Sequence, residues 1–407
     1  MKSGPVSQCP LAGIRVLDFS RLLPGPYCSF LLAELGADVI KIESPLLGDW
    51  GRLAPPELGL GGMFGAVNRG KRSLAINVRR PAGRAAILRL AATVDVVLEA
   101  GRPGAMSERG LGYEDLRAVN PDIVYCSLSG YGASGPDAAR AGHDVDYLAV
   151  SGLLALGVEP GSRPTPPGFQ VADLAGGMLA AIAILGALLG RERSGQGAYL
   201  DVGLLDAAVS WLDALGAAAS DSGAGALTGQ LPCYGIYETA DGRHLAVGAL
   251  EPPFWVAFCG ALERPDLVER QYDPAAVADV AAVLRGRTAG TWLGVFEGTD
   301  ACVAPVNAPV EAVAQPQVRH RLLARPALPP APAHGADTAA ILREAGLDDE
   351  AIAGLVAAGV VGVDADRPQV TARFDARLAR LARLAGKLAV RRSERPVGVT
   401  ERHRKRP

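Results

Sequence analysis

Three side chains combine a reactive type with surroundings that suit proton transfer. His143 follows a glycine-rich segment after a predicted strand, and a neutral imidazole that titrates near physiological pH can act as a general base. Asp173 comes just before a long apolar helical run, and Glu251 interrupts the end of an apolar strand and precedes two prolines. Carboxylates in such places can serve as bases or nucleophiles, or can orient a histidine.

Each of these residues also has a purely structural interpretation. His143 could lie in a loop or cap a helix beside Asp144. Aspartate is a favoured N-cap, so capping alone explains Asp173. Glu251 could cap the next helix, whose first turn tolerates proline. On position alone, the structural interpretation is favoured for all three residues.

Basic residues near predicted strand ends could hold a phosphorylated ligand. They fall in the segments NRGKRSLAINVRR and GRPGAMSERG, and comprise Arg69, Lys71, Arg72, Arg79, Arg102 and Arg109. The sequence contains neither GxGxxG nor GxxxxGK[ST], so it lacks both glycine-rich phosphate-binding fingerprints. A polyphosphate would therefore have to meet side chains, and arginines are suited to clamp it.

The elements that position these residues alternate between strand and helix. GIRVLDF, SFLLAELGA and DVIKIE predict a strand, a helix and a strand, and the alternation continues through SLAINV to DIVYCSLSG. Such a pattern indicates a mostly parallel sheet with helices on its faces, which binds ligands beyond the carboxyl ends of its strands. We predict an α/β large domain over residues 1–220, completed by about 331–364.

A second, smaller α+β domain is predicted over residues 225–330. The small, turn-rich segment SDSGAGALTGQLP is typical of a linker. It is followed by YGIYETADGRHLAVGAL, two β-rich segments around a DG turn, which predicts a hairpin.

Charge separates the C-terminal extension from the rest of the chain. The 407 residues carry a formal net charge of −2, which does not favour a nucleic-acid partner. Residues 365–407, however, contain 13 Lys or Arg and 4 Asp or Glu. Their helical pattern favours an amphipathic helix packed on its own protein, with a membrane-surface or polyanion-binding helix as the alternative.

Other features favour a cytoplasmic protein without a metal site. The six cysteines are far apart and form no CxxC pair, which argues against a zinc site or a disulfide framework. The N-terminus lacks the apolar core of a signal peptide. The apolar run from Ala175 to Gly190 is shorter than the roughly 20 residues that span a bilayer, so we predict a buried helix and no membrane span.

Several long motifs in order, over about residues 8–362, resemble the class III CoA-transferase superfamily. They are PLAGIRVLDFSRLLPGPYCSFLLAELGADVIKIE, NRGKRSLAINV, GRPGAMSERGLGYEDL, SGYGASGPDAARAGHDVDYLA and RERSGQGAYLDVGLLDA. The resemblance implies an interlocked homodimer with a Rossmann-like large domain that holds CoA, plus a small domain. The basic extension after about Val363 has no counterpart in this pattern.

Within that superfamily, GHDVDY, VADLAGG and VGALEPPFW are similar to the α-methylacyl-CoA racemase branch. There the His, Asp and Glu at these places form the active site, which implies His143, Asp173 and Glu251. The resemblance implies an isomerase that inverts the α-carbon of 2-methylacyl-CoA thioesters through an enolate. CoA then enters as part of the substrate, and no other cofactor is expected.

The same resemblance implies the CoA contacts, among them Asn77, Arg79, Gly101, Arg102, Arg109, Asp144 and Tyr147. Ser44 departs from the pattern, because the family often has an arginine there. One alternative is a CoA-transferase in which Asp173 attacks an acyl-CoA and carries CoA as a thioester. The other is a non-catalytic acyl-CoA-binding dimer whose basic extension docks on a partner or an anionic surface.

Overall fold

The computed structural model describes residues 9–53, 60–156, 158, 161–216 and 227–362. These residues form two compact units. The sheet unit contains the described residues up to Arg140, then Asp173–Leu204, and those from Leu328 onward. The second unit contains Ala141–Ala172 and Leu205–Ala327, so it includes two segments that the sequence placed in the large domain.

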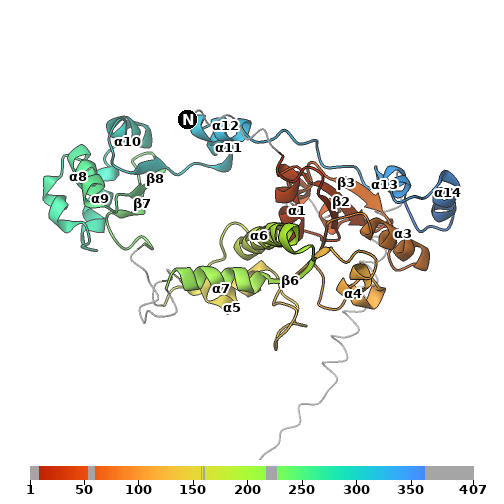
Figure 1. The fold of residues 1–407 in the computed structure, drawn as a ribbon. Coiled ribbons are helices and arrows are strands. Elements are labelled where there is room, and N and C mark those ends of the chain that lie inside the picture. Colours follow the sequence, from red (N-terminus) through yellow and green to blue (C-terminus); the bar gives the residue numbers. More distant parts are fainter. Residues whose placement is uncertain (1–8, 54–59, 157, 159–160, 217–226, 363–407) are drawn as a thin grey trace, which may run out of the picture. The chain divides into compact units, whose positions relative to one another are not determined.

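A six-stranded sheet is the centre of the sheet unit (Figure 1). Its strands are β1 (Arg15–Asp18), β2 (Asp38–Glu43), β3 (Arg72–Ala75), β4 (Val96–Glu99), β5 (Val124–Ser129) and β6 (Ala198–Gly203). All neighbours are parallel, in the order β3-β2-β1-β4-β5-β6. The predicted parallel sheet is therefore confirmed, and its strand order is that of Rossmann folds, with the switch point between β1 and β4.

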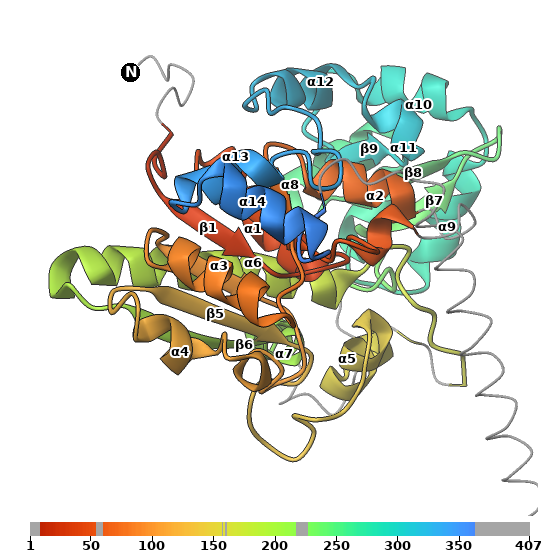
Figure 2. The ribbon, with the colours of Figure 1, turned by 90° about the vertical axis from the view of Figure 1, so that its right-hand side faces the viewer.

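Helices cover both faces of this sheet. They are α1 (Pro24–Glu34), α2 (Leu60–Val67), α3 (Pro81–Ala91), α4 (Tyr113–Arg117), α6 (Val171–Ser194), α13 (Thr338–Glu344) and α14 (Asp349–Ala357). Figure 2 shows α13 and α14 beside α3. The returning segment is also tied to the sheet through a bridge between Ile76 and Val361.

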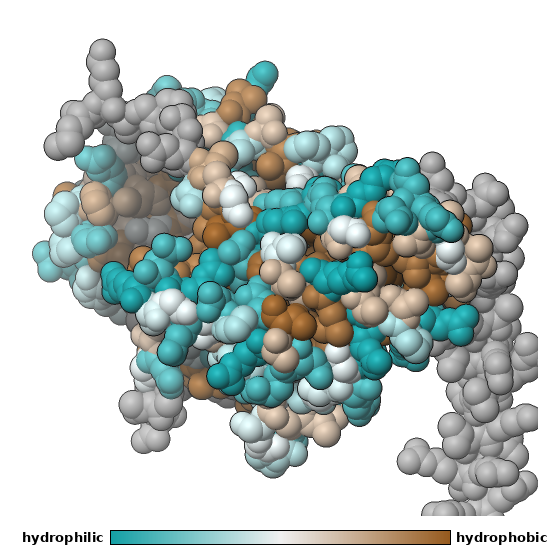
Figure 3. Space-filling model, turned by 45° about the vertical axis from the view of Figure 1, so that its right-hand side comes forward, coloured by the Kyte–Doolittle hydropathy of each residue, from teal (hydrophilic) through white to brown (hydrophobic). Residues whose placement is uncertain are grey.

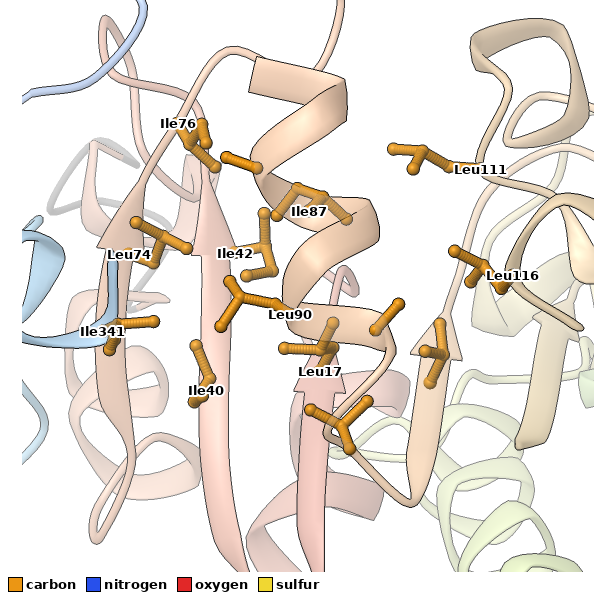
Figure 4. Packing of buried hydrophobic residues seen from close by; sticks show 14 of the residues in the cluster. Leu17, Ile40, Ile42, Leu74, Ile76, Ile87, Leu90, Leu111, Leu116 and Ile341 are labelled. Carbon is orange, nitrogen blue, oxygen red and sulfur yellow. The ribbon is translucent and has the colours of Figure 1, made fainter. Parts of the chain in front are cut away.

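One face of the sheet packs a hydrophobic core against α3. Ile87 and Leu90 point from α3 toward Leu17 and Ile40 on the strands, and all four side chains are fully buried (Figure 4). Ile87 and Leu90 lie three residues apart on α3, which is the spacing of one helix face. The amphipathic pattern of PAGRAAILRLAATV therefore positions this helix.

The opposite face of the sheet carries a buried polar layer. Residues alternate between the faces of a strand, so Lys41 and Glu43 of β2 lie opposite Ile40 and Ile42. Glu43 accepts bonds from the Arg52 guanidinium at 2.8 Å (Nε and Nη2) and from the Ser73 hydroxyl at 2.7 Å. Burial raises the pKa of Glu43, but Arg52, Lys41 and Ser73 outweigh it and hold the pKa at about 2.

Glu43→Gln is expected to lower the free energy of unfolding by about 3 kcal/mol at pH 7, because the ordinary pKa of 4.5 is depressed to about 2. A depressed carboxyl pKa stabilises the fold above pH 4.5 and loses that contribution as the pH falls toward 2. Urea unfolding of both proteins between pH 7 and 3.5 measures the difference, which should shrink below pH 4.5. A difference that stays constant with pH would contradict the assignment.

The second unit contains a small antiparallel sheet with its own core. Strands β7 (Tyr234–Glu238) and β8 (His244–Gly248) pair antiparallel, which confirms the predicted hairpin, and β9 (Val303–Pro305) adds to β8. The helices of this unit are α5 (Asp144–Ser151), α7 (Leu204–Ala214), α8 (Pro252–Ala261), α9 (Ala276–Leu284), α10 (Ala289–Phe296), α11 (Pro309–Ala312) and α12 (Pro316–Leu323). Trp255, Phe258 and Trp292 fill the core between the sheet and α8–α10.

Two predictions concern residues that lie partly or wholly outside the described ranges. Most of the predicted linker SDSGAGALTGQLP lies outside the described residues, as does the whole basic extension, residues 365–407.

Helix α6 is long and apolar enough to cross a membrane by length and composition, yet 44% of its most apolar window is buried within the protein. The helix itself was predicted correctly, but its burial is incomplete: Met178, Ile182 and Leu189 are 47%, 64% and 57% exposed. Its glycines pack one side of the helix against Pro24 of α1 and against Leu204, whereas these three side chains lie on other parts of its surface. Hydrophobic residues also reach the surface on the face drawn in Figure 3.

Candidate functional site

The carboxyl ends of the parallel strands lie along one edge of the sheet, and the strand order reverses between β1 and β4. Open α/β sheets bind ligands outside the carboxyl ends of their strands at such a switch point. In Rossmann folds the first helix offers its N-terminal N–H groups to a phosphate. Here the first turn of α1 contains Pro24 and Pro26, which have no N–H, and the space beside Gly25 is filled by Ser20. Helix α1 is thus unsuited to hold a phosphate, which agrees with the missing glycine fingerprint.

A basic cavity of about 330 Å³ lies in the sheet unit, beyond β3. It is lined by Val78, Arg79, Arg80, Pro81, Arg84, Glu108 and Arg109. Four guanidinium groups against one carboxylate give the cavity a net positive charge. Such a cavity suits a phosphorylated ligand, because arginines donate paired hydrogen bonds to phosphate.

Asn77 builds the loop that presents two of these arginines. Its Oδ1 accepts from the Arg79 backbone N–H at 3.1 Å, and its carbonyl accepts from the Arg80 N–H at 3.1 Å. Helix α3 approaches this loop closely, since a Cβ at Gly83 would lie 2.3 Å from the Asn77 carbonyl oxygen. Arg79 and Arg109, which were predicted as ligand contacts, therefore line the same cavity, and Asn77 shapes the loop that carries Arg79.

Gly101 and Arg102 lie in the loop that follows β4. The Gly101 N–H donates to Glu99 Oε2 at 2.7 Å, and the Ser127 hydroxyl donates to Glu99 Oε1 at 2.6 Å. Burial raises the pKa of Glu99, against the opposing effects of Ser127 and Gly101. Sequence reasoning missed Glu99, although an acid at the end of an apolar strand was the signal that singled out Glu251.

Three basic residues of the NRGKRS segment do not belong to a ligand-binding cluster. Lys71 is fully buried beside Asp18, and Arg72 pairs with Asp38 and Glu344. Arg69 stacks its guanidinium over the Phe30 ring. The prediction that these residues clamp a polyphosphate is therefore wrong for Lys71 and Arg72, because carboxylates of the sheet unit pair with them, and Arg69 is not among the residues that line the basic cavity.

His143 immediately precedes α5 and is exposed. Its backbone N–H donates to Asp146 Oδ2 at 2.9 Å, and the buried Tyr147 donates its hydroxyl to the Gly142 carbonyl at 2.7 Å. Asp144 is the first residue of the helix. The helix-capping position considered for His143 is thus confirmed. The bonds from Asp146 and Tyr147 fix the backbone at His143 and at the preceding Gly142.

Asp173 lies in the first turn of α6, not at its cap, because the helix begins two residues earlier at Val171. A carboxylate in a first turn is favoured by the helix dipole. Two glycines one turn later allow close packing: a Cβ at Gly177 would lie 2.5 Å from the Pro24 carbonyl oxygen, and one at Gly176 would lie 2.2 Å from Leu204 Cδ2. The VADLAGG segment therefore holds the Asp173 turn against α1.

Glu251 occupies the N-cap position of α8, but its side chain makes no capping hydrogen bond. The two residues that follow, Pro252 and Pro253, have no N–H to offer it. The glutamate is exposed. The capping interpretation thus accounts for the position of Glu251 and not for its carboxylate.

The three predicted catalytic residues each stand at the start of a different helix. His143 precedes α5 and Glu251 precedes α8, both in the second unit, whereas Asp173 lies in α6 of the sheet unit. Each of the three residues thus lies where a helix N-terminus stabilises negative charge. Among the described residues, no three His, Cys, Asp or Glu side chains gather as metal ligands would.

Known proteins are similar to this chain in sequence and in fold. The model for CoA-transferase family III matches residues 11–340. Succinyl-CoA:glutarate CoA-transferase from Homo sapiens is 34% identical over 397 residues, 86% of this chain and 90% of that protein. Alpha-methylacyl-CoA racemase from Mus musculus is 35% identical over 375 residues, 84% of this chain and 95% of that protein.

A crystal structure of a CAIB/BAIF family protein from Brucella suis superimposes with a TM-score of 0.72 at 30% identity, covering 83% of this chain and 99% of that chain. The long match, the parallel sheet and the order of the motifs agree, and the predicted resemblance is confirmed. The chain belongs to CoA-transferase family III.

Proposed function

We propose that this protein is a racemase that inverts the α-carbon of 2-methylacyl-CoA thioesters. The observation that carries the proposal is that His143 and Glu251 both occupy helix N-cap positions while Asp173 lies in a first helical turn. A transferase needs only the aspartate, as nucleophile. A racemase needs two groups that exchange protons, and the chain supplies a histidine and an aspartate for them.

The chemistry requires that a weakly acidic α-proton leaves one face of the carbon and a proton arrives on the other. We assign His143, supported by Glu251, to one face and Asp173 to the other, their roles exchanging with direction. Deprotonation leaves the electron pair on an enolate whose oxygen carries the charge. Helix N-termini near such a charge stabilise it, the more so where water is excluded.

CoA is assigned to the sheet unit, with its phosphates at the basic cavity. Arg79, Arg84 and Arg109 line that cavity. Gly101 and Arg102 follow β4 and precede Arg109 by a few residues in the sequence. Asp144 and Tyr147 belong to the helix that begins after His143, and we assign them to the thioester end of the same ligand. The proposal includes no metal and no organic cofactor beyond the CoA of the substrate.

Arg79→Ala and Arg109→Ala are each expected to weaken CoA binding about tenfold or more, since a hydrogen bond to a charged group contributes about 1.5–3 kcal/mol. Calorimetric titration measures the change, and its salt dependence should decrease in both variants. Arg89→Ala, an exposed arginine of α3 outside the cavity, is the matched control. Pantetheine, which lacks the phosphates, should bind all four proteins equally, and a loss of pantetheine binding would contradict the assignment.

A CoA-transferase is the second candidate, because relatives with transferase names match as well as those with the racemase name. In that reaction the Asp173 carboxylate attacks the acyl-CoA carbonyl and CoA thiolate leaves. CoA then attacks the acyl-aspartyl anhydride, releases the donor acid and stays bound as a thioester. A second carboxylic acid finally accepts the CoA.

Incubation of (R)- and (S)-2-methylacyl-CoA in deuterated water, without an acceptor acid, tests the proposal. The racemase incorporates deuterium at the α-carbon and converts each epimer into a mixture of both. A transferase gives no exchange, but forms a new CoA ester when a carboxylic acid is added. The second result would replace the racemase by the transferase.

A homodimer and a cytoplasmic location are part of the same proposal. The exposed stripe of Met178, Ile182 and Leu189 on α6 supports the dimer, because such a stripe is more stable when a second surface covers it. Sedimentation equilibrium of the full chain tests the dimer, and a monomer at micromolar concentration would refute it.

A further inference from the structure

The buried ammonium of Lys71 connects segments that are far apart in the sequence. Its Nζ donates to the Pro26 carbonyl at 2.9 Å, to the Ser29 hydroxyl at 2.7 Å and to Asn68 Oδ1 at 2.9 Å. It also lies 3.2 Å from Asp18 Oδ2, and both side chains of this ion pair are fully buried. Lys71 therefore joins the end of β1, the first turn of α1 and the residue that follows α2.

Burying the positive charge of Lys71 costs free energy. Burial lowers the pKa of Lys71 to about 8, even with Asp18 beside it. Replacing buried ion pairs by apolar residues is often neutral or stabilising, so stability alone does not explain why a lysine occupies this place. The ammonium instead fixes the relative positions of its hydrogen-bond acceptors, because each of them must stay within bonding distance of Lys71 Nζ.

The turn of α1 that Lys71 holds is the surface on which α6 rests. Gly177 approaches the Pro24 carbonyl so closely that a Cβ there would lie 2.5 Å from the oxygen. Leu174 packs against the cluster of Leu23, Phe30 and Val67 from α1 and α2. Asp173 is the residue before Leu174, and it lies one helical turn from Gly177 on the same helix face.

We propose that Lys71 is a positioning residue for Asp173, which it keeps in place by holding the first turn of α1 against α6. The inference rests on the proposed function, in which Asp173 exchanges a proton with one face of the substrate. A displacement of about 1 Å at a reacting group can lower a rate about 100-fold. Loss of the ammonium therefore impairs the Asp173 step while the His143 step, in the second unit, continues.

The test measures the two steps separately in Lys71→Met. Each epimer is incubated in deuterated water, and exchange with retention is followed beside inversion. We expect inversion to fall at least about tenfold. Exchange with retention from the epimer deprotonated by His143 should change less than about twofold, since that route does not need Asp173. Ser29→Ala, which removes one acceptor of the ammonium, should lower inversion by a smaller factor and likewise leave exchange with retention nearly unchanged.

Lys41→Met is the matched control. Lys41 is equally buried, but its Nζ bonds to Asp49 at 2.8 Å and to the Ser20 carbonyl at 3.1 Å, not to α1. It should lower both rates by one common factor, the fraction of folded protein, which circular dichroism reports.

A common factor for Lys71→Met as well would overturn the inference and leave a structural role. If that variant does not fold, a common factor for Ser29→Ala overturns it equally. Failure of the proposed function is seen separately, as the absence of exchange in the wild-type protein.

Discussion

His143→Ala is expected to lower proton exchange at one face of the substrate α-carbon by about 10²–10⁴-fold, which is the usual contribution of a positioned general base. The ring stands at the start of α5, where Asp146 and Tyr147 fix the backbone on both sides of it. Removing the ring leaves these bonds intact, so CoA binding should change little. Deuterium incorporation from each epimer separately is the measurement.

The expected result is specific because the two proposed bases act on opposite faces of the substrate α-carbon. In the proposed reaction one epimer loses its proton to His143 and the other to Asp173, so only the first should become inert to exchange. The second should still exchange with retention, but it can no longer invert. His320→Ala, an exposed histidine of α12, should leave both rates unchanged. Unimpaired exchange from both epimers, together with weaker binding, would show that His143 contacts the ligand without acting as a base.

Glu251→Gln separates the orienting role from the catalytic one. Glutamine keeps the size of the side chain and removes its charge, and no capping bond is lost, because the carboxylate makes none. We expect the His143 face to slow, and the Asp173 face to remain at its wild-type rate. Deuterium incorporation from each epimer of the substrate measures the two faces separately, and equal slowing of both would contradict an orienting role for Glu251.

Much of the framework could be predicted because local patterns specify it. The alternation of apolar strands with amphipathic helices gives the parallel sheet, and the DG turn between β-rich segments gives the β7–β8 hairpin. The same patterns place His143 and Glu251 at helix starts, since a glycine-rich loop and a pair of prolines mark those boundaries. For these two residues, the position at a helix start could thus be predicted from nearby residues alone.

The surroundings of charged side chains are not readable in that way. Lys71 and Arg79 are both basic residues near strand ends, yet one is enclosed by Asp18 and backbone carbonyls while the other lines an open cavity. The difference depends on α1 and Asn68, which come from other parts of the fold. Glu99 was missed for the same reason, because its partners Gly101 and Ser127 lie on two different elements.

Asp173→Asn is expected to give the clearest distinction between the two candidate reactions. Asparagine keeps the shape of the side chain in the first turn of α6, but its amide can neither accept a proton as a base nor attack a thioester. In the racemase, inversion from either epimer should fall by about 10²–10⁴-fold. Exchange with retention by way of His143 should survive, because that base and the enolate it forms are unaffected.

In the transferase, the same substitution has a different consequence. No exchange occurs in either protein, and the CoA thioester on the aspartate, detected as a mass increase of the wild-type chain with acyl-CoA, disappears in the variant. Asp206→Asn is the matched control, since Asp206 also lies in a first helical turn, that of α7. Surviving one-sided exchange supports a base at position 173, whereas a lost covalent adduct supports a nucleophile. Because one carboxylate is suited to both roles, the proposal that Asp173 serves a racemase depends on His143 and Glu251, and these two measurements test it.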